Sequence, residues 1–382
     1  MDKIKGEMCP RPSSDADSVN DIHAIDTLFR EAGLIRSLRG KIASRARRLR
    51  IEHGTSKDPT LAAPAPRIAP NGVQYLTVPK WENIPWLWHG FSTRKGGVSR
   101  AYCPEGTPGD LNLGFTASDS RDSVLRNRQL FAEAVTGDPA TAVVTVRQIH
   151  SAMVIPVMAA DPLCKEFCDT VAADGGSPER KADGLMTDEP GLLLGVQTAD
   201  CIPVLVADRK RRAVAAFHAG WRGTVKRIVE NGIGRMRLEF GSHPEDLTAA
   251  IGPGIGACCY AVGEEVLSGF ESQFVYAREL FREVYDADEV RRKYPMLFLT
   301  QRAPGHSPIG PNLHLDLVEA NRRQLLAAGL KPRSIHVVGG CTSCQTELFF
   351  SHRASKGHAG RMLSVIGIHH PLAKWRRSSA SC

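Results

Sequence analysis

The feature that most constrains the fold is a set of short apolar segments bounded by polar or glycine-containing breaks. Two of them, GLLLGVQTAD and CIPVLVAD, follow each other directly over residues 191–208 and meet at Asp200-Cys201. A third, AVAAFHAG at 213–220, comes after the charged turn DRKRR. Short apolar runs between turn signals are typical of buried strands. The fold therefore has to accommodate an acid and a thiol side by side where two apolar strands meet, or where one strand breaks.

Fewer segments have a helical period, and they lie between the predicted strands. Residues 223–241 carry apolar side chains at helical spacing, and residues 314–330 form a second such segment with Gly329 near its end. Strands and helices alternate without a regular βαβ rhythm. The sequence therefore predicts a layered α/β, or α+β, sandwich rather than a Rossmann fold. Further strands are predicted at 73–81, 86–93, 137–150, 334–340 and 362–368.

The two ends of the chain differ in composition from the rest. Residues 1–70 hold 13 basic and 9 acidic residues and include a Pro/Ala-rich stretch, and residues 371–382 carry three basic residues and no acid. We predict a partly helical or disordered basic arm (1–70), one catalytic domain (71–370) and a basic tail (371–382), with a polar inserted loop at 161–182. Because the net charge of +8 lies almost entirely in the ends, a nucleic-acid partner is not expected for the core.

The cysteines and the apolar runs indicate the cellular compartment of the protein. No apolar run reaches the ~18 residues of a membrane span, and the N-terminus has no apolar core of a secretory signal. Ten cysteines without a secretory signal indicate a reducing compartment, so we expect a cytoplasmic protein with no membrane partner. The pairs Cys164/Cys168 and Cys341/Cys344 have spacings compatible with a four-thiolate zinc site, but the long separation between the pairs favours free or half-buried thiols.

Three residues at the ends of predicted strands are candidate metal ligands. His150 closes VVTVRQIH, Cys201 follows LLLGVQTAD, and His218 lies in AVAAFHAG. One thiolate and two imidazoles suit Zn²⁺, with a fourth position for water or substrate. Taken singly, each also fits a hydrogen-bonded histidine or a small core cysteine. Asp200 can share a cleft with its neighbour Cys201 only if the strand breaks there, because successive residues of a strand face opposite sides.

Three basic loops that contain glycine favour a small anionic ligand. Arg94 lies in GFSTRKGGVS, Arg222 in HAGWRGT just before a predicted helix, and Arg353 in FFSHRASKGHAGR. Glycine-rich turns expose backbone N–H groups, and guanidinium groups bind phosphate oxygens in pairs. In a core of nearly neutral charge, these loops indicate phosphate or a similar small anion rather than a polymer.

Several motifs in a fixed order resemble one family. HGFSTRKGGVS, LNLG, VRQIHS, ADGLMTD, GVQTADCIPVLVAD, AFHAGWRGT, AIGPGIGACCYAVGEEV and CTSCQTELFFSHRASKGHAGR resemble the laccase-domain, or polyphenol-oxidase-like, family of purine nucleoside phosphorylases over about residues 80–368. The resemblance implies an α/β/β/α sandwich similar to bacterial toxin deamidase domains. It also implies phosphorolysis of adenosine, inosine, guanosine and methylthioadenosine to the free base and ribose 1-phosphate, with an adenosine deaminase side activity.

The resemblance also suggests roles for individual residues. It implies a zinc bound by His150, Cys201 and His218, and it makes Arg94 a phosphate or substrate contact. Together with the loop argument, we predict that Arg94 and Arg222 bind purine nucleoside or phosphate. We predict that Asp200, Cys201 and Arg353 are catalytic. Both a monomer and a dimer stay open.

Two other activities are compatible with the same residues. A copper-binding, laccase-like polyphenol oxidase would need closely spaced His-x-His pairs, and none of the 13 histidines stands two residues from another. Two histidines and a cysteine do occur in copper sites, so copper binding in vitro stays open. A cysteine hydrolase or deamidase would use Cys201 as nucleophile with His218 or His150 as base. A zinc nucleobase deaminase fold is excluded because no Pro-Cys-x-x-Cys motif occurs.

Overall fold

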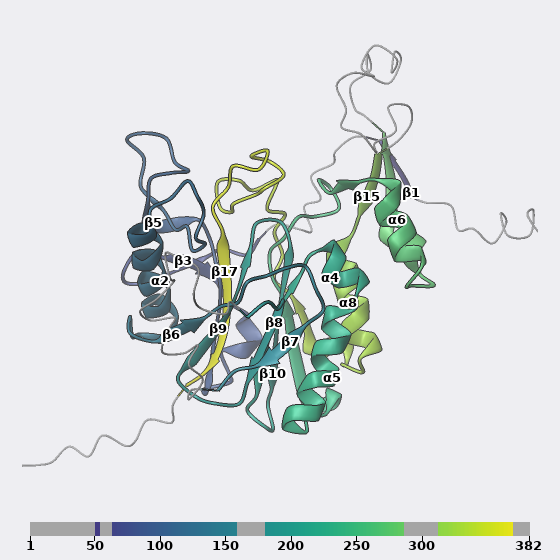
Figure 1. Ribbon diagram of the computed structural model, residues 1–382, viewed down its shortest axis with the longest axis horizontal. Coiled ribbons are helices and arrows are strands. Elements are labelled where there is room, and N and C mark those ends of the chain that lie inside the picture. The colour runs from purple at the N-terminus through teal and green to yellow at the C-terminus, as the bar shows by residue number, and fades with distance from the viewer. Residues whose placement is uncertain (1–49, 54–62, 159–179, 286–311, 370–382) are drawn as a thin grey trace, which may run out of the picture. The chain divides into compact units, whose positions relative to one another are not determined.

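The computed structural model describes residues 50–53, 63–158, 180–285 and 312–369 (Figure 1). Most of the predicted arm and inserted loop, and all of the predicted tail, lie outside these residues, so the predictions about them are not tested. The helices of the described residues are all too short or too polar to cross a membrane.

The first of two large sheets has six strands, with the C-terminal strand near its middle. This strand pairs antiparallel with one neighbour from the start of the domain and with another from its centre. Helix α2 (Arg121–Thr136) packs Leu130 and Phe131 against the outer face of this sheet. The strands are, in order across the sheet, β2 (Arg67–Ile68), β3 (Gln74–Leu76), β4 (Leu87–Ser92), β17 (Met362–Ile368), β9 (Leu192–Thr198) and β6 (Ala142–Val144).

The second large sheet also has six strands, and three helices cover its outer face (Figure 1). The helices are α4 (Trp221–Val225), α5 (Ile228–Phe240) and α8 (Leu317–Ala327). The strands are, in order, β16 (Ile335–Val337), β12 (Leu247–Ile251), β10 (Ile202–Asp208), β11 (Val214–Ala219), β8 (Gly184–Thr187) and β7 (Val154–Pro156).

The inner faces of the two sheets pack against each other. Leu194 of β9 and Ile366 of β17 belong to the same buried cluster as Leu205 of β10 and Ala216 of β11. Apolar side chains on both faces of a sheet require a layer on each side. The layers therefore run helix, sheet, sheet, helix, which confirms the predicted α/β/β/α sandwich. Its similarity to toxin deamidase domains stays a prediction.

The break in the apolar run 191–208 is the point where the chain changes sheets. Strand β9 belongs to the first sheet and β10 to the second. Only Ala199, Asp200 and Cys201 connect them, and Asp200 takes a left-handed φ of 92°. A non-glycine residue at such an angle is uncommon and marks a sharp change in chain direction. The acid and the thiol therefore lie at an edge of the sandwich rather than inside a strand.

Two predicted elements differ in the structure, one strand being shorter and one helix being divided in two. The predicted strand 73–81 ends at Leu76, because Pro79 fixes its own φ and begins a 3₁₀ turn, η2 (Pro79–Trp81). The predicted helix 223–241 is two helices, α4 and α5, since Arg227 between them has φ 60°. On α8, Gln324 Nε2 donates to the Thr224 carbonyl at 2.7 Å and so fixes the end of α4.

A smaller sheet of four strands completes the described residues. Its order is β1 (Arg50–His53), β14 (Phe281–Tyr285), β15 (Asn312–Leu315) and β13 (Ala261–Val262). The remaining elements are β5 (Lys95–Ser99), α6 (Glu264–Glu271), η3 (Pro244–Asp246), η4 (Ala277–Leu280) and η6 (Pro332–Ser334).

Candidate metal centre

The three predicted ligands come together at one edge of the sandwich. The ligand atoms of His150, Cys201 and His218 all lie within 4.8 Å of one another, and the two imidazole rings are 5.0 Å apart. Cys201 comes from the β9–β10 connection, and His218 lies in β11, where it pairs with Pro203 of β10. Residues separated by 68 positions in the chain thus form one set of donors.

The loop that carries His150 is fixed by side-chain hydrogen bonds. The sequence predicted a strand up to His150, but β6 ends at Val144 and His150 has a left-handed φ of 56°. Gln148 exchanges two hydrogen bonds with the backbone of Gln197 on β9: its Nε2 donates to the carbonyl at 2.8 Å, and its Oε1 accepts from the N–H at 2.7 Å. These bonds hold the loop against the first sheet.

Asp183 connects two of the ligands. This fully buried acid precedes β8, and its carboxylate accepts the backbone N–H groups of Ile149, His150 and Ser151 at 2.6–3.2 Å. The same carboxylate lies 2.9 Å from Nδ1 of His218. A carboxylate only accepts hydrogen bonds, so Nδ1 carries a proton and Nε2 is left for a metal ion, the arrangement that usually orients a histidine ligand.

The protonation of these groups follows from their mutual contacts. Burial by itself raises the pKa of Cys201, but the charges and hydrogen bonds of His218 and His150 outweigh it and lower that pKa to about 6. Burial lowers the pKa of His218, but Cys201 and Asp183 more than offset this and raise it to about 9. Without metal the pair is therefore a thiolate beside an imidazolium. The thiolate is the form of cysteine that binds metal ions.

Gly220 of the HAGW motif closes one side of the centre. A Cβ atom at this position would lie 2.8 Å from Cys201 Sγ and 3.1 Å from His150 Cδ2. Both separations are too short for ordinary contact between these atoms. The glycine therefore allows β11 and α4 to approach the thiol as closely as the three-ligand arrangement requires.

The carboxylate of Asp200 joins two loops. Its Oδ1 accepts from the Thr342 hydroxyl at 2.6 Å, and its Oδ2 accepts from the Arg353 backbone N–H at 2.6 Å. Its own carbonyl accepts from the Ile255 N–H at 2.8 Å. Because Asp200 is next to Cys201, these bonds fix the loops 252–260 and 340–353 relative to the metal ligands.

Comparison with known proteins identifies the family of this chain. Residues 88–369 match the family described as multi-copper polyphenol oxidoreductase laccase. The chain belongs to this family. It is 33% identical over 299 residues to the purine nucleoside phosphorylase of Bacteroides thetaiotaomicron, which covers 77% of this chain and 95% of that protein. It is 35% identical over 278 residues to the purine nucleoside phosphorylase YlmD of Geobacillus stearothermophilus, covering 73% and 89%.

Solved structures of similar proteins share the fold of this laccase-family member. The YfiH crystal structure from Bacillus licheniformis matches with a TM-score of 0.60 at 30% identity and covers 79% of this chain and 98% of that one. The YlmD crystal structure from Geobacillus stearothermophilus matches with a TM-score of 0.58 at 32% identity, covering 78% and 96%.

The three predicted arginines of this laccase-family chain differ in their contacts. The guanidinium of Arg94 pairs with Asp110, its Nε and one terminal nitrogen donating to the two carboxylate oxygens. The terminal nitrogens also donate to the carbonyls of Thr346 and Tyr102 at 2.9 and 3.0 Å. These bonds engage all of its nitrogen atoms in holding loops together. A phosphate contact by Arg94 stays a prediction, and the bonds observed are those of a positioning residue.

Arg222 and Arg353 are both exposed and lie over aromatic rings. Arg222 stacks on Trp221 at 4.5 Å from the ring centroid, and Arg353 lies 5.4 Å from the centroid of Tyr260. Arg353 also donates from a terminal nitrogen to the Ala261 carbonyl at 2.8 Å. Their exposure leaves the guanidinium groups accessible to an anion.

Two residues of the site were not identified from the sequence. Asp183 is part of ADGLMTD and Tyr260 is part of CCYAVGEEV, motifs that the sequence singled out without assigning a role to either side chain. Burial raises the pKa of Tyr260, and the negative charges of Cys201 and Asp200 raise it further. Tyr260 is therefore a neutral phenol, and it lies close enough to the candidate ligands for the charge of Cys201 to raise its pKa.

Proposed function

We propose that this protein is a purine nucleoside phosphorylase with one zinc ion bound by His150, Cys201 and His218. The observation that carries the proposal is the convergence of these three donors, whose ligand atoms lie within 4.8 Å of one another. Two imidazoles and a thiolate with an open fourth position form a donor set typical of catalytic zinc. When bound, the ion supplies Lewis-acid activation of an oxygen atom. The names of the relatives support the substrate class.

The substrates that we propose are adenosine, inosine, guanosine and methylthioadenosine. A phosphate oxygen attacks C1′ of the ribose while the bond from C1′ to the purine nitrogen breaks. The purine nitrogen takes up a proton, and the free base and a ribose 1-phosphate leave the site. Adenosine deamination, in which water replaces the 6-amino group and ammonia leaves, is a side activity. Phosphate carries charge that must be held in place, and guanidinium groups do this with paired hydrogen bonds. We assign this role to Arg353 and Arg222, which are exposed, and to Arg94 the positioning of the loops around them.

The leaving purine develops negative charge, which the site has to stabilise. Tyr260 keeps its phenolic proton and lies beneath Arg353. We propose that its hydroxyl donates a hydrogen bond to the nucleoside. Asp200 acts by holding the Arg353 backbone at 2.6 Å, so the predicted catalytic acid serves mainly to position the loop that binds phosphate.

The test uses the purified full-length chain with adenosine, inosine, guanosine or methylthioadenosine, with and without phosphate, followed by chromatography of the products. Bases and sugar phosphates are expected only when phosphate is present, and Cys201→Ala is expected to abolish them. Cys103→Ser is the matched control, since Cys103 is a free thiol that is not among the ligands. Formation of inosine from adenosine as the sole reaction, independent of phosphate, would contradict the proposal.

A cysteine hydrolase is a second candidate, because Cys201, His218 and Asp183 are connected as a thiol, a base and an orienting acid. The two candidates differ in the metal content of this centre. A zinc ion that is lost in Cys201→Ala and protects Cys201 from alkylation supports the phosphorylase. A centre free of metal, inactivation by a stoichiometric agent that alkylates Cys201, and hydrolysis of an amide together support the hydrolase.

The family description favours a third candidate, a copper-dependent oxidase. Two histidines and one cysteine bind copper in electron-transfer sites that absorb strongly in the visible range. Protein loaded with copper and assayed with a diphenol separates this activity from phosphorolysis. Oxygen consumption without nucleoside cleavage would favour the oxidase.

A further inference from the structure

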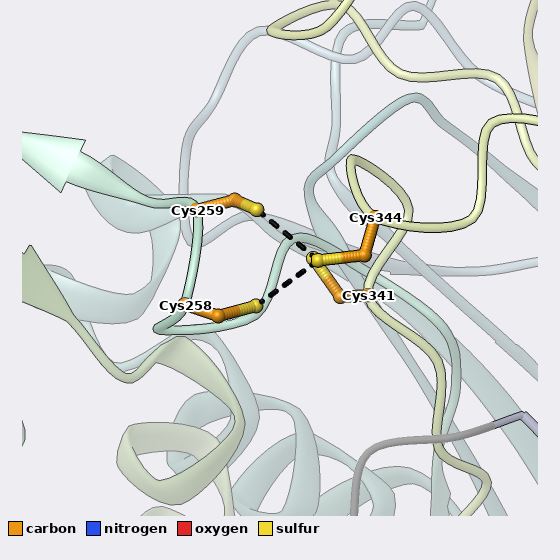
Figure 2. Close-up of side chains that lie close together, drawn as sticks. All are labelled: Cys258, Cys259, Cys341 and Cys344. Atoms are coloured by element: carbon orange, nitrogen blue, oxygen red, sulfur yellow. Dashed lines mark hydrogen bonds between the residues drawn. The ribbon is translucent and has the colours of Figure 1, made fainter. Parts of the chain in front are cut away.

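A second group of thiols lies apart from the three-ligand centre. Cys258, Cys259, Cys341 and Cys344 point toward one another from two loops (Figure 2). Their four sulfur atoms all lie within 4.8 Å of one another. The sulfur of Cys344 is 3.5 Å from that of Cys258 and 3.3 Å from that of Cys259. The cysteine spacing in the sequence groups Cys341 and Cys344 with Cys164 and Cys168, and that second pair lies outside the described residues.

The backbone holds the two loops in register. One loop follows β12 and the other follows β16, and these two strands pair in parallel. The pairing continues beyond the strands as an isolated bridge between Gly254 and Cys341, and the Thr342 N–H donates to the Gly254 carbonyl at 3.0 Å. The thiols therefore converge because of sheet geometry, and their approach does not depend on the conformation of a loose loop.

Two of the four thiols are buried and two are half-buried. Cys341 is 2% exposed and Cys258 is 7% exposed, and both pack with Ile255. The Gly256 N–H donates to the sulfur of Cys341 at 3.2 Å. Sulfur atoms that converge from two backbone-paired loops are soft donors, an arrangement that a soft cation stabilises.

We propose that Cys258, Cys259, Cys341 and Cys344 bind one structural zinc ion. Zinc bound by four thiolates is tetrahedral with Zn–S bonds of about 2.3 Å, so neighbouring sulfurs lie about 3.8 Å apart. The observed separations of 3.3 and 3.5 Å, and the upper limit of 4.8 Å, bracket that value. Four protein ligands leave no open position, and such closed sites are structural. Soft sulfur donors also select zinc over hard cations such as Mg²⁺.

The position of this ion explains what it would stabilise. Cys259 directly precedes Tyr260, and Cys341 directly precedes Thr342. Tyr260 lies under Arg353, and the Thr342 hydroxyl donates to Asp200 at 2.6 Å. The ion would therefore tie together the two loops that form one wall of the candidate active site. The binding of this ion by the four cysteines does not depend on the proposed reaction, whereas its effect on activity rests on the proposed function.

The competing chemistry is oxidation. Cys344 is near both Cys258 and Cys259, and a disulfide with either one would require an oxidant to accept two electrons and would release two protons. A disulfide would leave two thiols, too few for a closed site. Counting thiols with a chromogenic disulfide reagent in denatured, metal-free protein separates the two chemistries, because zinc leaves all ten cysteines reduced and a disulfide leaves two fewer.

The first experiment counts zinc in full-length protein purified without added chelator. We expect two zinc ions per chain in the natural sequence and in the Cys103→Ser control. One ion is expected in the triple variant His150→Ala, Cys201→Ser, His218→Ala. One ion is also expected in the variant Cys259→Ser, Cys344→Ser, whose substituted positions are both half-buried. If the four cysteines bind zinc but the three-ligand centre does not, the natural chain and the triple variant would both hold one ion. A triple variant without zinc would overturn the present proposal.

The second experiment identifies the ligands without any assay of activity. The triple variant is loaded with Co²⁺, whose sulfur-to-metal charge-transfer absorption grows with the number of thiolates. We expect an absorption per cobalt several times that of the Cys259→Ser, Cys344→Ser variant, which keeps only the centre with a single thiolate. Equal absorption in the two variants would overturn the assignment. If the double variant does not fold, the zinc count and the cobalt spectrum of the triple variant decide.

The third measurement concerns the wall of the active site. The Cys259→Ser, Cys344→Ser variant is expected to keep the zinc ion bound by His150, Cys201 and His218. Its kcat/KM is expected to fall about 10- to 100-fold, since small displacements of binding groups lower the rate on that scale. Unchanged activity together with loss of one zinc would limit the ion to a role in stability.

Discussion

The Nδ1 atom of His218 lies 2.9 Å from Oδ1 of Asp183, and the same oxygen accepts the backbone N–H of His150 at 2.9 Å. One buried carboxylate oxygen thus orients the two histidines of the candidate metal centre, one through its side chain and the other through its backbone. The ring of His218 and the loop of His150 are therefore fixed relative to each other before any ion binds.

Replacing Asp183 with Asn is expected to weaken zinc binding 10- to 100-fold, the usual cost of losing the carboxylate behind a histidine ligand. An amide has one accepting oxygen, so its NH₂ group would face a backbone N–H or the protonated Nδ1. Competition with a chromogenic chelator measures the affinity.

The matched control for Asp183→Asn is Asp208→Asn. Asp208 is also fully buried, and its Oδ1 accepts from the N–H groups of Lys210 and Arg211 at 2.8 and 2.9 Å in a turn between β10 and β11. This variant is expected to keep its zinc affinity. Equal losses in both variants would mean that Asp183 acts only through general stability.

Gly220→Ala is expected to prevent the three ligands from closing around an ion. The added Cβ would lie 2.8 Å from Cys201 Sγ, so the thiol or β11 has to move. We expect at least about a tenfold loss of zinc affinity, on the scale of other supporting contacts of metal sites. Gly234→Ala in α5 is the control, because its added Cβ would meet nothing within 4 Å beyond its chain neighbours and the adjacent backbone of its own helix, and alanine favours helices by up to about 1 kcal/mol. Both variants are compared by zinc titration and by thermal unfolding.

The sequence predicted the layered fold and singled out the three candidate ligands, because apolar strands and the residues at their ends are local signals. It did not predict that β9 and β10 lie in different sheets, since a buried strand of either sheet has the same apolar pattern. The connection at Asp200 therefore looked like a broken strand, although it is a change of sheet with a left-handed φ of 92°.

Long-range partners are the part that local patterns could not supply. Asp183 and His218 are 35 residues apart, and Cys258 and Cys344 are 86 apart. The adjacent cysteines 258 and 259 lack the two-residue spacing of common zinc motifs, so they gave no signal of their own. Arg94 was predicted from its glycine loop as a phosphate contact, but nothing near it in the sequence indicated that its guanidinium would pair with Asp110.

Thr342→Val is expected to loosen the loop that carries Arg353 while leaving the side chains of all the proposed metal ligands unchanged. Thr342 is fully buried and donates to Asp200 Oδ1 at 2.6 Å, and valine has the same shape without the hydroxyl. An unpaired buried acceptor costs about 1–3 kcal/mol. The free energy of unfolding should fall by that amount and KM for phosphate should rise, with zinc content unchanged. Thr342→Ser, which keeps the hydroxyl, is expected to restore KM, and a failure to do so would exclude the hydrogen bond as the cause.

His89 is expected to make the fold sensitive to mild acid. It is 8% exposed in β4, and its Nε2 accepts from the Val78 N–H at 2.9 Å. Burial lowers the pKa of His89 from 6.5 to about 4. Between these values the unfolded chain binds a proton that the folded chain does not, so the contribution is complete above pH 6.5 and is lost as the pH falls toward 4.

At pH 5 the linkage predicts a loss of about 2 kcal/mol relative to pH 7.5 from this one residue. The measurement is urea unfolding at both pH values for the natural chain and for His89→Gln, whose side-chain oxygen can still accept from Val78 but does not titrate. Because the other titrating groups are common to both proteins, their effects cancel in the comparison. The natural chain should lose more stability in acid than the variant by this amount, and an equal loss would show that protonation of His89 is not what destabilises the fold.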